Sequence, residues 1–196
     1  AVLCLPDGSE QAAVEAGAIE VVVAALRAHP QAVGVQSQGC CALRNMCTGS
    51  DGSDAAGWAR CQRAAAAGAI EVVVAALRAR LQVAAVQEDG CSALANMCFG
   101  DDAAAAARKQ RAAAGGAIEE VVAALRAHPQ EGEVQEEGCC ALLRICSGVS
   151  GVRARRQRAT QAGARTVAVA AMQAHPHHGG VQRYGQRVLD CLPAEV

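Results

Sequence analysis

Residues 68–79 read GAIEVVVAALRA, residues 17–28 carry the same twelve letters, and residues 116–127 differ from them at one position. A fourth, more divergent copy begins at Gly163. The first residues of the four copies are 51, 48 and 47 residues apart: Gly17, Gly68, Gly116 and Gly163. Recurrence at such a period predicts a repeat architecture, in which each unit packs on its neighbours.

Further residues recur at fixed offsets from these glycines. The twelfth following residue is basic, and proline comes next in three of the four copies: His29, Arg80, His128 and His175. A Val-Gln pair begins eighteen residues after each glycine, at Val35, Val86, Val134 and Val181. A second glycine follows each pair: Gly39, Gly90, Gly138 and Gly185. Agreement at so many offsets extends the predicted repeat beyond the quoted stretch.

The pattern predicts three helices in each unit. The first is short and ends at the initial glycine, because glycine commonly terminates a helix. The second carries one apolar stripe at helical spacing: Ile70, Val73, Val74 and Leu77. The third is expected from about Val35 to Cys47, with a buried stripe of Val35, Gly39, Ala42, Leu43 and Met46.

The units resemble the armadillo repeat, whose third helix reads roughly Val-Gln, a small residue, and then Ala-Leu-x-Asn-Leu. The first unit matches with Val35-Gln36, Gly39, Ala42-Leu43 and Asn45-Met46; the second repeats the match through Asn96, and the third has Arg144 instead of Asn. The resemblance runs from about Gln11 to Leu192. It implies an all-α fold, a right-handed armadillo-like superhelix (α-solenoid) of three-helix repeats.

We therefore expect a single armadillo-repeat domain over 1–196, with units at about 11–58, 59–107, 108–152 and 153–192. The period is slightly long for the family, and the excess is assigned to links at 48–58, 99–107 and 147–153, which are interpreted as loops with a frayed helix start. The fourth unit is altered, with Arg165 in place of isoleucine. A polar final unit is typical of a C-terminal cap.

The resemblance also implies a binding face. In this family the third helices line a concave groove, and their asparagines hold the backbone of an extended peptide. Asn45 and Asn96 match that position, whereas Arg144 and Cys191 do not. The tryptophans of nuclear-import receptors are absent, which argues against binding of nuclear-localisation signals. The predicted contact residues are Asn45, Asn96, Arg144, Arg44, Cys41 and Ser92.

Charge and hydropathy restrict the partners. A net charge of -1 argues against broad binding of nucleic acid or anionic membrane. No apolar run approaches the length of a membrane span. A basic cluster precedes the fourth unit and is interpreted as a solvated helix face, or as a contact patch for an acidic partner: Arg153, Arg155, Arg156 and Arg158.

The eleven cysteines mostly recur in register, which favours small buried core residues over disulfide or redox use. So many thiols suggest an intracellular, reducing compartment: the cytoplasm, or an organelle after removal of a targeting peptide. The chain begins at Ala1, which fits either a processed mature chain or a piece of a longer one. The recurring turn histidines are expected to be local caps. His175, His177 and His178 cluster near the C-terminus and could hold a metal weakly, but we expect no carboxylate or cysteine to complete a metal site.

The sequence shows no nucleophile motif, no phosphate-binding glycine loop and no paired carboxylates in a plausible cleft, so we expect a protein that is not an enzyme and needs no cofactor or metal. The first hypothesis is a non-catalytic scaffold, an accessory subunit docked in a larger protein complex. The alternative is a transient peptide-recognition module that uses the concave groove.

Overall fold

The computed structural model describes residues 17–48 and 55–192, which contain eleven α-helices and no strand. The first helices of the units are α4 (Ala55–Ala67), α7 (Ala103–Ala114) and α10 (Val152–Ala162). The second helices are α2 (Ala18–Ala28), α5 (Ala69–Ala79), α8 (Ala117–Ala127) and α11 (Ala164–Ala174). The third helices are α3 (Val33–Met46), α6 (Ala84–Met97), α9 (Gly132–Ile145) and α12 (Gly179–Cys191).

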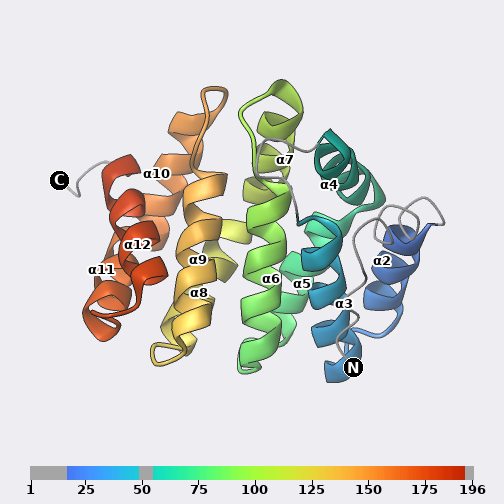
Figure 1. The fold of residues 1–196 in the computed structure, drawn as a ribbon, viewed down its shortest axis with the longest axis horizontal. Helices are drawn as coiled ribbons and strands as arrows, with labels where there is room; N and C mark the ends of the chain where they lie inside the picture. The colour runs from blue at the N-terminus through green and yellow to red at the C-terminus, as the bar shows by residue number, and fades with distance from the viewer. Residues whose placement is uncertain (1–16, 49–54, 193–196) are drawn as a thin grey trace.

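These helices form an armadillo-like α-solenoid, which confirms the predicted fold class. Figure 1 shows the third helices side by side along the front of the molecule, with the second helices behind them. The first helices lie along the upper edge. The predicted start of the first unit, before residue 17, lies outside the described residues.

Two glycines show why the repeat needs this residue type. Gly68 joins α4 to α5 with φ of 91°, a left-handed conformation that only glycine adopts without strain. Gly90 lies where α6 crosses α5, and a Cβ placed there would come within 2.7 Å of Leu77 Cδ2. The first glycine therefore sets the turn between helices, and the second sets how closely the second and third helices approach.

The core is built from aliphatic and small side chains that lie between successive units. Ile70, Leu77 and Leu94 are fully buried in the middle of the stack. Val72 and Val21 hold equivalent positions in α5 and α2, yet Val72 is 7% exposed and Val21 is 68% exposed. Val21 is more exposed because, among the described residues, α2 has a neighbouring unit on one side only, whereas α5 lies between two units.

The first helices begin earlier than the sequence patterns indicated. α4 and α7 start at Ala55 and Ala103, inside stretches for which a loop with only a frayed helix start was expected. Asp102 caps α7, because its Oδ1 accepts a hydrogen bond of 2.6 Å from the Ala105 amide. The alanine run that follows has the highest intrinsic helix propensity. The excess length of the units is thus partly helix rather than loop.

The glutamine of each Val-Gln pair has a structural role that the predicted apolar stripe missed. Gln87 is buried, and its Nε2 donates hydrogen bonds of 3.0 Å to the carbonyl oxygens of Leu77 and Arg80 at the end of α5. The equivalent glutamines of the other three units make the same pair of bonds: Gln36, Gln135 and Gln182. In the first unit Gln36 is buried, whereas the predicted stripe residues Val35 and Ala42 are only half-buried.

Candidate functional site

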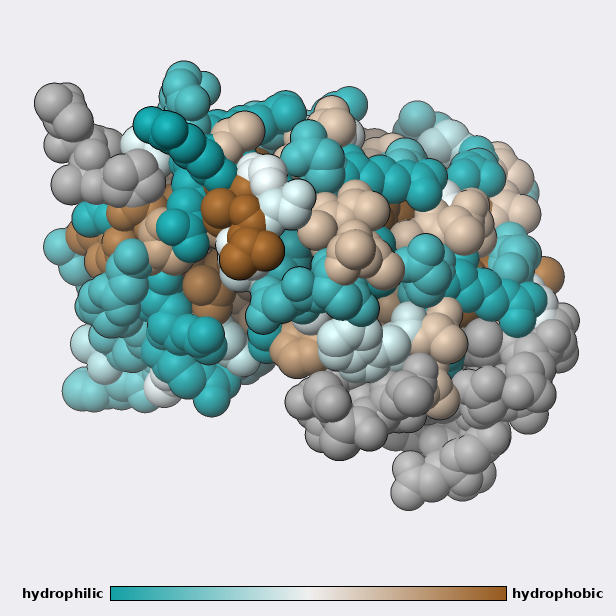
Figure 2. Space-filling view, turned by 90° about the horizontal axis from the view of Figure 1, so that it is seen from above, coloured by the Kyte–Doolittle hydropathy of each residue, from teal (hydrophilic) through white to brown (hydrophobic). Residues whose placement is uncertain are grey.

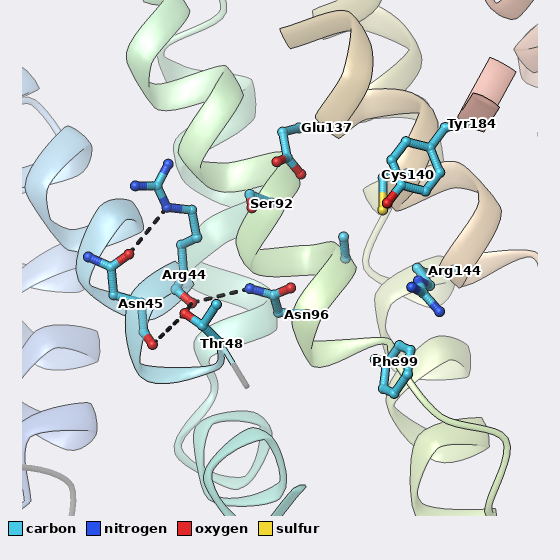
Figure 3. A pocket seen from close by; sticks show the side chains of 11 residues that line it. Arg44, Asn45, Thr48, Ser92, Asn96, Phe99, Glu137, Cys140, Arg144 and Tyr184 are labelled. Atoms are coloured by element: carbon cyan, nitrogen blue, oxygen red, sulfur yellow. Dashed lines mark hydrogen bonds between the residues drawn. The ribbon is translucent and has the colours of Figure 1, made fainter. Parts of the chain in front are cut away.

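The surface formed by α3, α6, α9 and α12, here called the third-helix face, contains a hollow of about 360 Å³ (Figure 3). Five of the six predicted contact residues line it: Arg44, Asn45, Ser92, Asn96 and Arg144. Cys41 lies beside the lining, and its Sγ accepts long hydrogen bonds from Arg44 and Asn45. The repeat period places these residues together, because equivalent positions of neighbouring third helices lie next to each other.

The two asparagines of the hollow have different surroundings. Nδ2 of Asn96 donates a hydrogen bond of 3.2 Å to the carbonyl oxygen of Arg44, so Asn96 joins α6 to the end of α3. Figure 3 shows the Asn96 amide oxygen pointing away from α3. Asn45 contacts only side chains of its own helix, at 3.4 Å from Arg44 Nε and 3.8 Å from Cys41 Sγ. Asn96 thus helps to hold the solenoid together, whereas Asn45 is held loosely.

Partly desolvated carboxylates lie in the hollow and next to it: Glu137 lines it, whereas Glu88 and Asp89 pair with its lining residue Arg44. Arg44 Nη1 forms ion pairs with Asp89 at 2.7 Å and Glu88 at 3.5 Å, both on α6. Burial raises the pKa of Glu88, Asp89 and Glu137 above their ordinary values, although Arg44 acts in the opposite direction on all three and a hydrogen bond from Ser92 also lowers the pKa of Glu137. The face therefore offers more negative charge than Arg44 neutralises.

The hollow also contains two aromatic side chains, Phe99 and Tyr184, which sequence reasoning missed. The Arg144 guanidinium lies over the Phe99 ring, with Cζ 4.3 Å from the ring centroid, a favourable cation–π contact. Tyr184 of α12 lies beside Cys140 in the same hollow (Figure 3). Two of the three aromatic residues of the chain lie here. The scarcity of aromatic residues was the sequence signal that could have drawn attention to Phe99 and Tyr184, because neither position recurs in the repeat.

The predicted basic cluster is not one contact patch. Arg155 is 2% exposed, and its guanidinium donates to the carbonyl oxygens of Ile145, Ser147 and Ser150. Including it in a partner-binding patch was wrong. Arg156 Nε donates to Cys146 O, and Arg158 pairs with Glu119 of the preceding unit. Arg153 is exposed.

Arg155 belongs to a periodic set that closes the ends of α3, α6 and α9. Arg60 and Arg108 donate in the same way to the last carbonyl oxygens of α3 and α6 and of the residues that follow them. The three arginines are 48 and 47 residues apart, which is the repeat period. A charged group buried with several backbone acceptors is a structural clamp.

The end of the molecule where the first helices lie carries no large apolar surface in the view of Figure 2, where hydrophilic residues alternate with small hydrophobic patches. Val149 is the most exposed of the large hydrophobic residues in the described chain, at 86%. Isolated apolar residues are normal on protein surfaces and do not indicate an interface by themselves.

The turn histidines connect neighbouring units instead of acting as purely local caps. A ring nitrogen of His128 lies 2.6 Å from Leu81 O, and one of His175 lies 2.9 Å from Pro129 O, both in the preceding turn. His178 differs, because Glu133 and Glu136 of α9 lie next to its ring. The fold thus brings carboxylates to the histidine cluster, and the expectation that none would be there was wrong.

The ten cysteines of the described part of the chain are thiols, and eight of them are buried. Burial raises the pKa of Cys40, Cys98, Cys139 and Cys146 to about 12, which strongly disfavours the nucleophilic thiolate. They fill the core, as predicted. No helix in residues 17–48 and 55–192 combines the length and hydrophobicity needed to cross a bilayer.

Comparison with known proteins supports the fold. No protein-family profile matches the chain, and no curated protein matches it. Among solved structures, it is similar to a designed armadillo repeat protein in complex with the peptide (KR)4, with a TM-score of 0.51 and 20% identity. The match covers 94% of this chain and 85% of the designed one. At this identity the likeness concerns the armadillo-type fold.

Proposed function

We propose that the chain is a non-catalytic scaffold that binds another protein through its third-helix face, as an accessory subunit of a larger complex. The observation that carries the proposal is the hollow of about 360 Å³, which gathers polar, charged and aromatic side chains from α3, α6, α9 and α12. The solved neighbour holds a peptide, and its fold is the same kind of solenoid.

The side chains of the hollow favour a segment of protein as the bound group. Asn45 and the amide oxygen of Asn96 can hydrogen-bond to a backbone. The Arg144–Phe99 pair offers a flat surface for an apolar or aromatic side chain. Glu137 in the hollow and Glu88, which pairs with the lining residue Arg44, suit a basic side chain, because a cation would offset the cost of their partial burial.

The rest of the described chain supports a role without catalysis. The buried thiols have raised pKa values, and the buried arginines are held by backbone carbonyls instead of facing a cleft. We further propose a reducing compartment for the protein, because ten thiols, eight of them buried, are compatible with such an environment.

Affinity capture with the full chain, followed by identification of stably bound proteins, tests the proposal. The double variant Asn45→Ala/Arg144→Ala should lower the affinity for a captured partner at least tenfold, because it removes a backbone-binding amide and the cation over Phe99. Arg153→Ala is the matched control, since Arg153 is exposed on α10, away from the hollow. Unchanged binding by the double variant would place the interface elsewhere.

Size-exclusion chromatography of native extracts tests the accessory-subunit role separately. We expect the chain to elute in a complex much larger than its own 19.9 kDa. Elution as a folded monomer with nothing bound would contradict this role, even if peptides bind to the hollow.

A further inference from the structure

His178 occupies the N-cap of α12 and faces the first turns of α9, where Glu133 and Glu136 approach its ring from two sides. His178 Nε2 lies 3.5 Å from Glu133 Oε1, and its Nδ1 lies 3.5 Å from Glu136 Oε2. One ligand atom from each of the three residues lies within 4.8 Å of the other two. The cluster therefore brings together an imidazole and two carboxylates from two different units.

Two of these residues depart from the repeat. Glu133 replaces Gly34 and Ala85 of the first two units, and His178 replaces Ala32 and Val83. Residues that serve the stacking recur in every unit, as the buried glutamines do. Glu133 and His178 are absent from the equivalent junctions, so packing of the solenoid does not require them.

Two glycines provide the space for this cluster. A Cβ on Gly132 would come within 2.9 Å of the His178 ring, and a Cβ on Gly180 would overlap the Glu136 carboxylate. A side chain at Gly132 would displace the His178 ring, and one at Gly180 would displace the Glu136 carboxylate. The close approach of His178 and Glu136 thus depends on the small residues Gly132 in α9 and Gly180 in α12.

We propose that Glu133, Glu136 and His178 bind a divalent transition-metal ion, for which Zn²⁺ is the best match. Zn²⁺ is bound by imidazole nitrogen and carboxylate oxygen, with three protein ligands and water where the site is open. Tetrahedral bonds of about 2.1 Å place neighbouring ligand atoms about 3.4 Å apart. Glu133 lies 3.5 Å from Nε2 and Glu136 lies 3.5 Å from Nδ1, so one carboxylate is already at this separation from the nitrogen that binds the ion and the other must turn toward it.

The balance of charge and exposure suits such an ion. Two carboxylates and a neutral imidazole neutralise a divalent cation. One ring nitrogen binds the ion, and the carboxylate at the other nitrogen rotates toward it, which the partial exposure of both glutamates permits. The bound ion would join α9 to α12 and fasten the last unit to the rest of the solenoid.

The first test is titration of the full chain with Zn²⁺ by calorimetry, after removal of metals with EDTA. We expect one ion per chain, and at least tenfold weaker binding by Glu133→Gln and by His178→Asn. Asparagine is chosen because it also caps helices and can replace the His178 contact with the Val181 amide. The matched control is Glu131→Gln, because Glu131 is an exposed carboxylate whose side chain makes no cap bond to α9.

The second test uses Co²⁺ as a spectroscopic probe. Binding by the cluster gives only ligand-field bands of nitrogen and oxygen ligands, whereas binding by cysteines gives a sulfur-to-metal charge-transfer band. Zn²⁺ should also raise the urea midpoint of the wild-type chain and leave that of Glu133→Gln unchanged. Absence of binding, a sulfur band, or equal affinity in the two cluster variants and the control would overturn the proposal.

Discussion

Asn96 donates a hydrogen bond of 3.2 Å to the carbonyl oxygen of Arg44 and thereby joins the third helices of two successive units. The same carbonyl also accepts a bond of 2.9 Å from the Thr48 hydroxyl. The bond to Asn96 occupies the amide nitrogen and leaves the amide oxygen on the side away from α3 (Figure 3). One residue of the hollow is therefore both a joint between units and a candidate contact for a partner.

Because Asn96 joins two units and Asn45 bonds within its own helix, we expect the two asparagines to contribute differently to stability. Asn96→Ala should lower the free energy of unfolding by about 1 kcal/mol, because it removes a partly buried hydrogen bond between units. Asn45→Ala should change it by less than about 0.5 kcal/mol, because the Asn45 contacts are long and lie within α3. Urea denaturation followed by circular dichroism measures both, and equal losses would contradict the distinction.

The buried glutamines predict a larger loss. Gln87→Leu should lower the free energy of unfolding by about 2 kcal/mol, because it removes two hydrogen bonds and leaves the carbonyl oxygens of Leu77 and Arg80 without them. Gln182→Leu in the last unit should cost less, since Gln182 is only half-buried. If both substitutions have the same cost in urea denaturation, burial does not determine the contribution of these bonds.

The sequence was sufficient for the fold because the features that define it recur. Gly68 and Gly90, with their counterparts in the other units, mark the helix junctions and crossings at a constant period. The same period placed Arg44, Asn45 and Asn96 on one face, although it could not show that Asn96 bonds to the neighbouring unit.

Residues that do not recur in the repeat could not be assigned a role from the sequence. Phe99 follows a third helix and Tyr184 lies in the divergent last unit, so no pattern indicated that both would line the hollow. His178 and Glu133 meet only through stacking of units, because they are far apart in the chain. Arg155, in contrast, does recur, in register with Arg60 and Arg108. It was assigned to a surface cluster because other arginines stand next to it in the sequence.

The burial of Arg155 predicts that substitutions of Arg155 and of Arg153 have different effects on stability. Arg155→Met should lower the free energy of unfolding by about 3 kcal/mol or more, because three backbone carbonyls lose a charged donor. Arg153→Met should change it by less than about 0.5 kcal/mol, because Arg153 is exposed. Thermal and urea denaturation of the two variants provides the comparison; a stable Arg155→Met chain would show that the clamp contributes little.

Glu137 predicts a pH-dependent effect on stability. Burial raises its pKa above the ordinary 4.5, so ionisation costs more in the folded chain than in the unfolded one. Its contribution to stability is therefore fully present below pH 4.5 and is lost as the pH rises through the folded-state pKa. Glu137→Gln should raise the urea midpoint at pH 7.5 and leave it unchanged at pH 4. A gain of equal size at both pH values would assign the effect to something other than ionisation.

The thiols differ in burial, and this difference predicts an order of chemical modification. At pH 8 a pKa of about 12 leaves about one Cys98 or Cys146 in ten thousand ionised, against about one in ten at the ordinary value of 9.0. Because the thiolate is the reactive form, both should react slowly with iodoacetamide in the folded chain. Cys41 and Cys191 are half-buried and should react first among the described cysteines.

Mass spectrometry of labelled peptides measures this order, which should disappear in 8 M urea, roughly the concentration that unfolds small domains. Early labelling of Cys98 in native buffer would show that the middle of the solenoid opens more readily than its packing indicates.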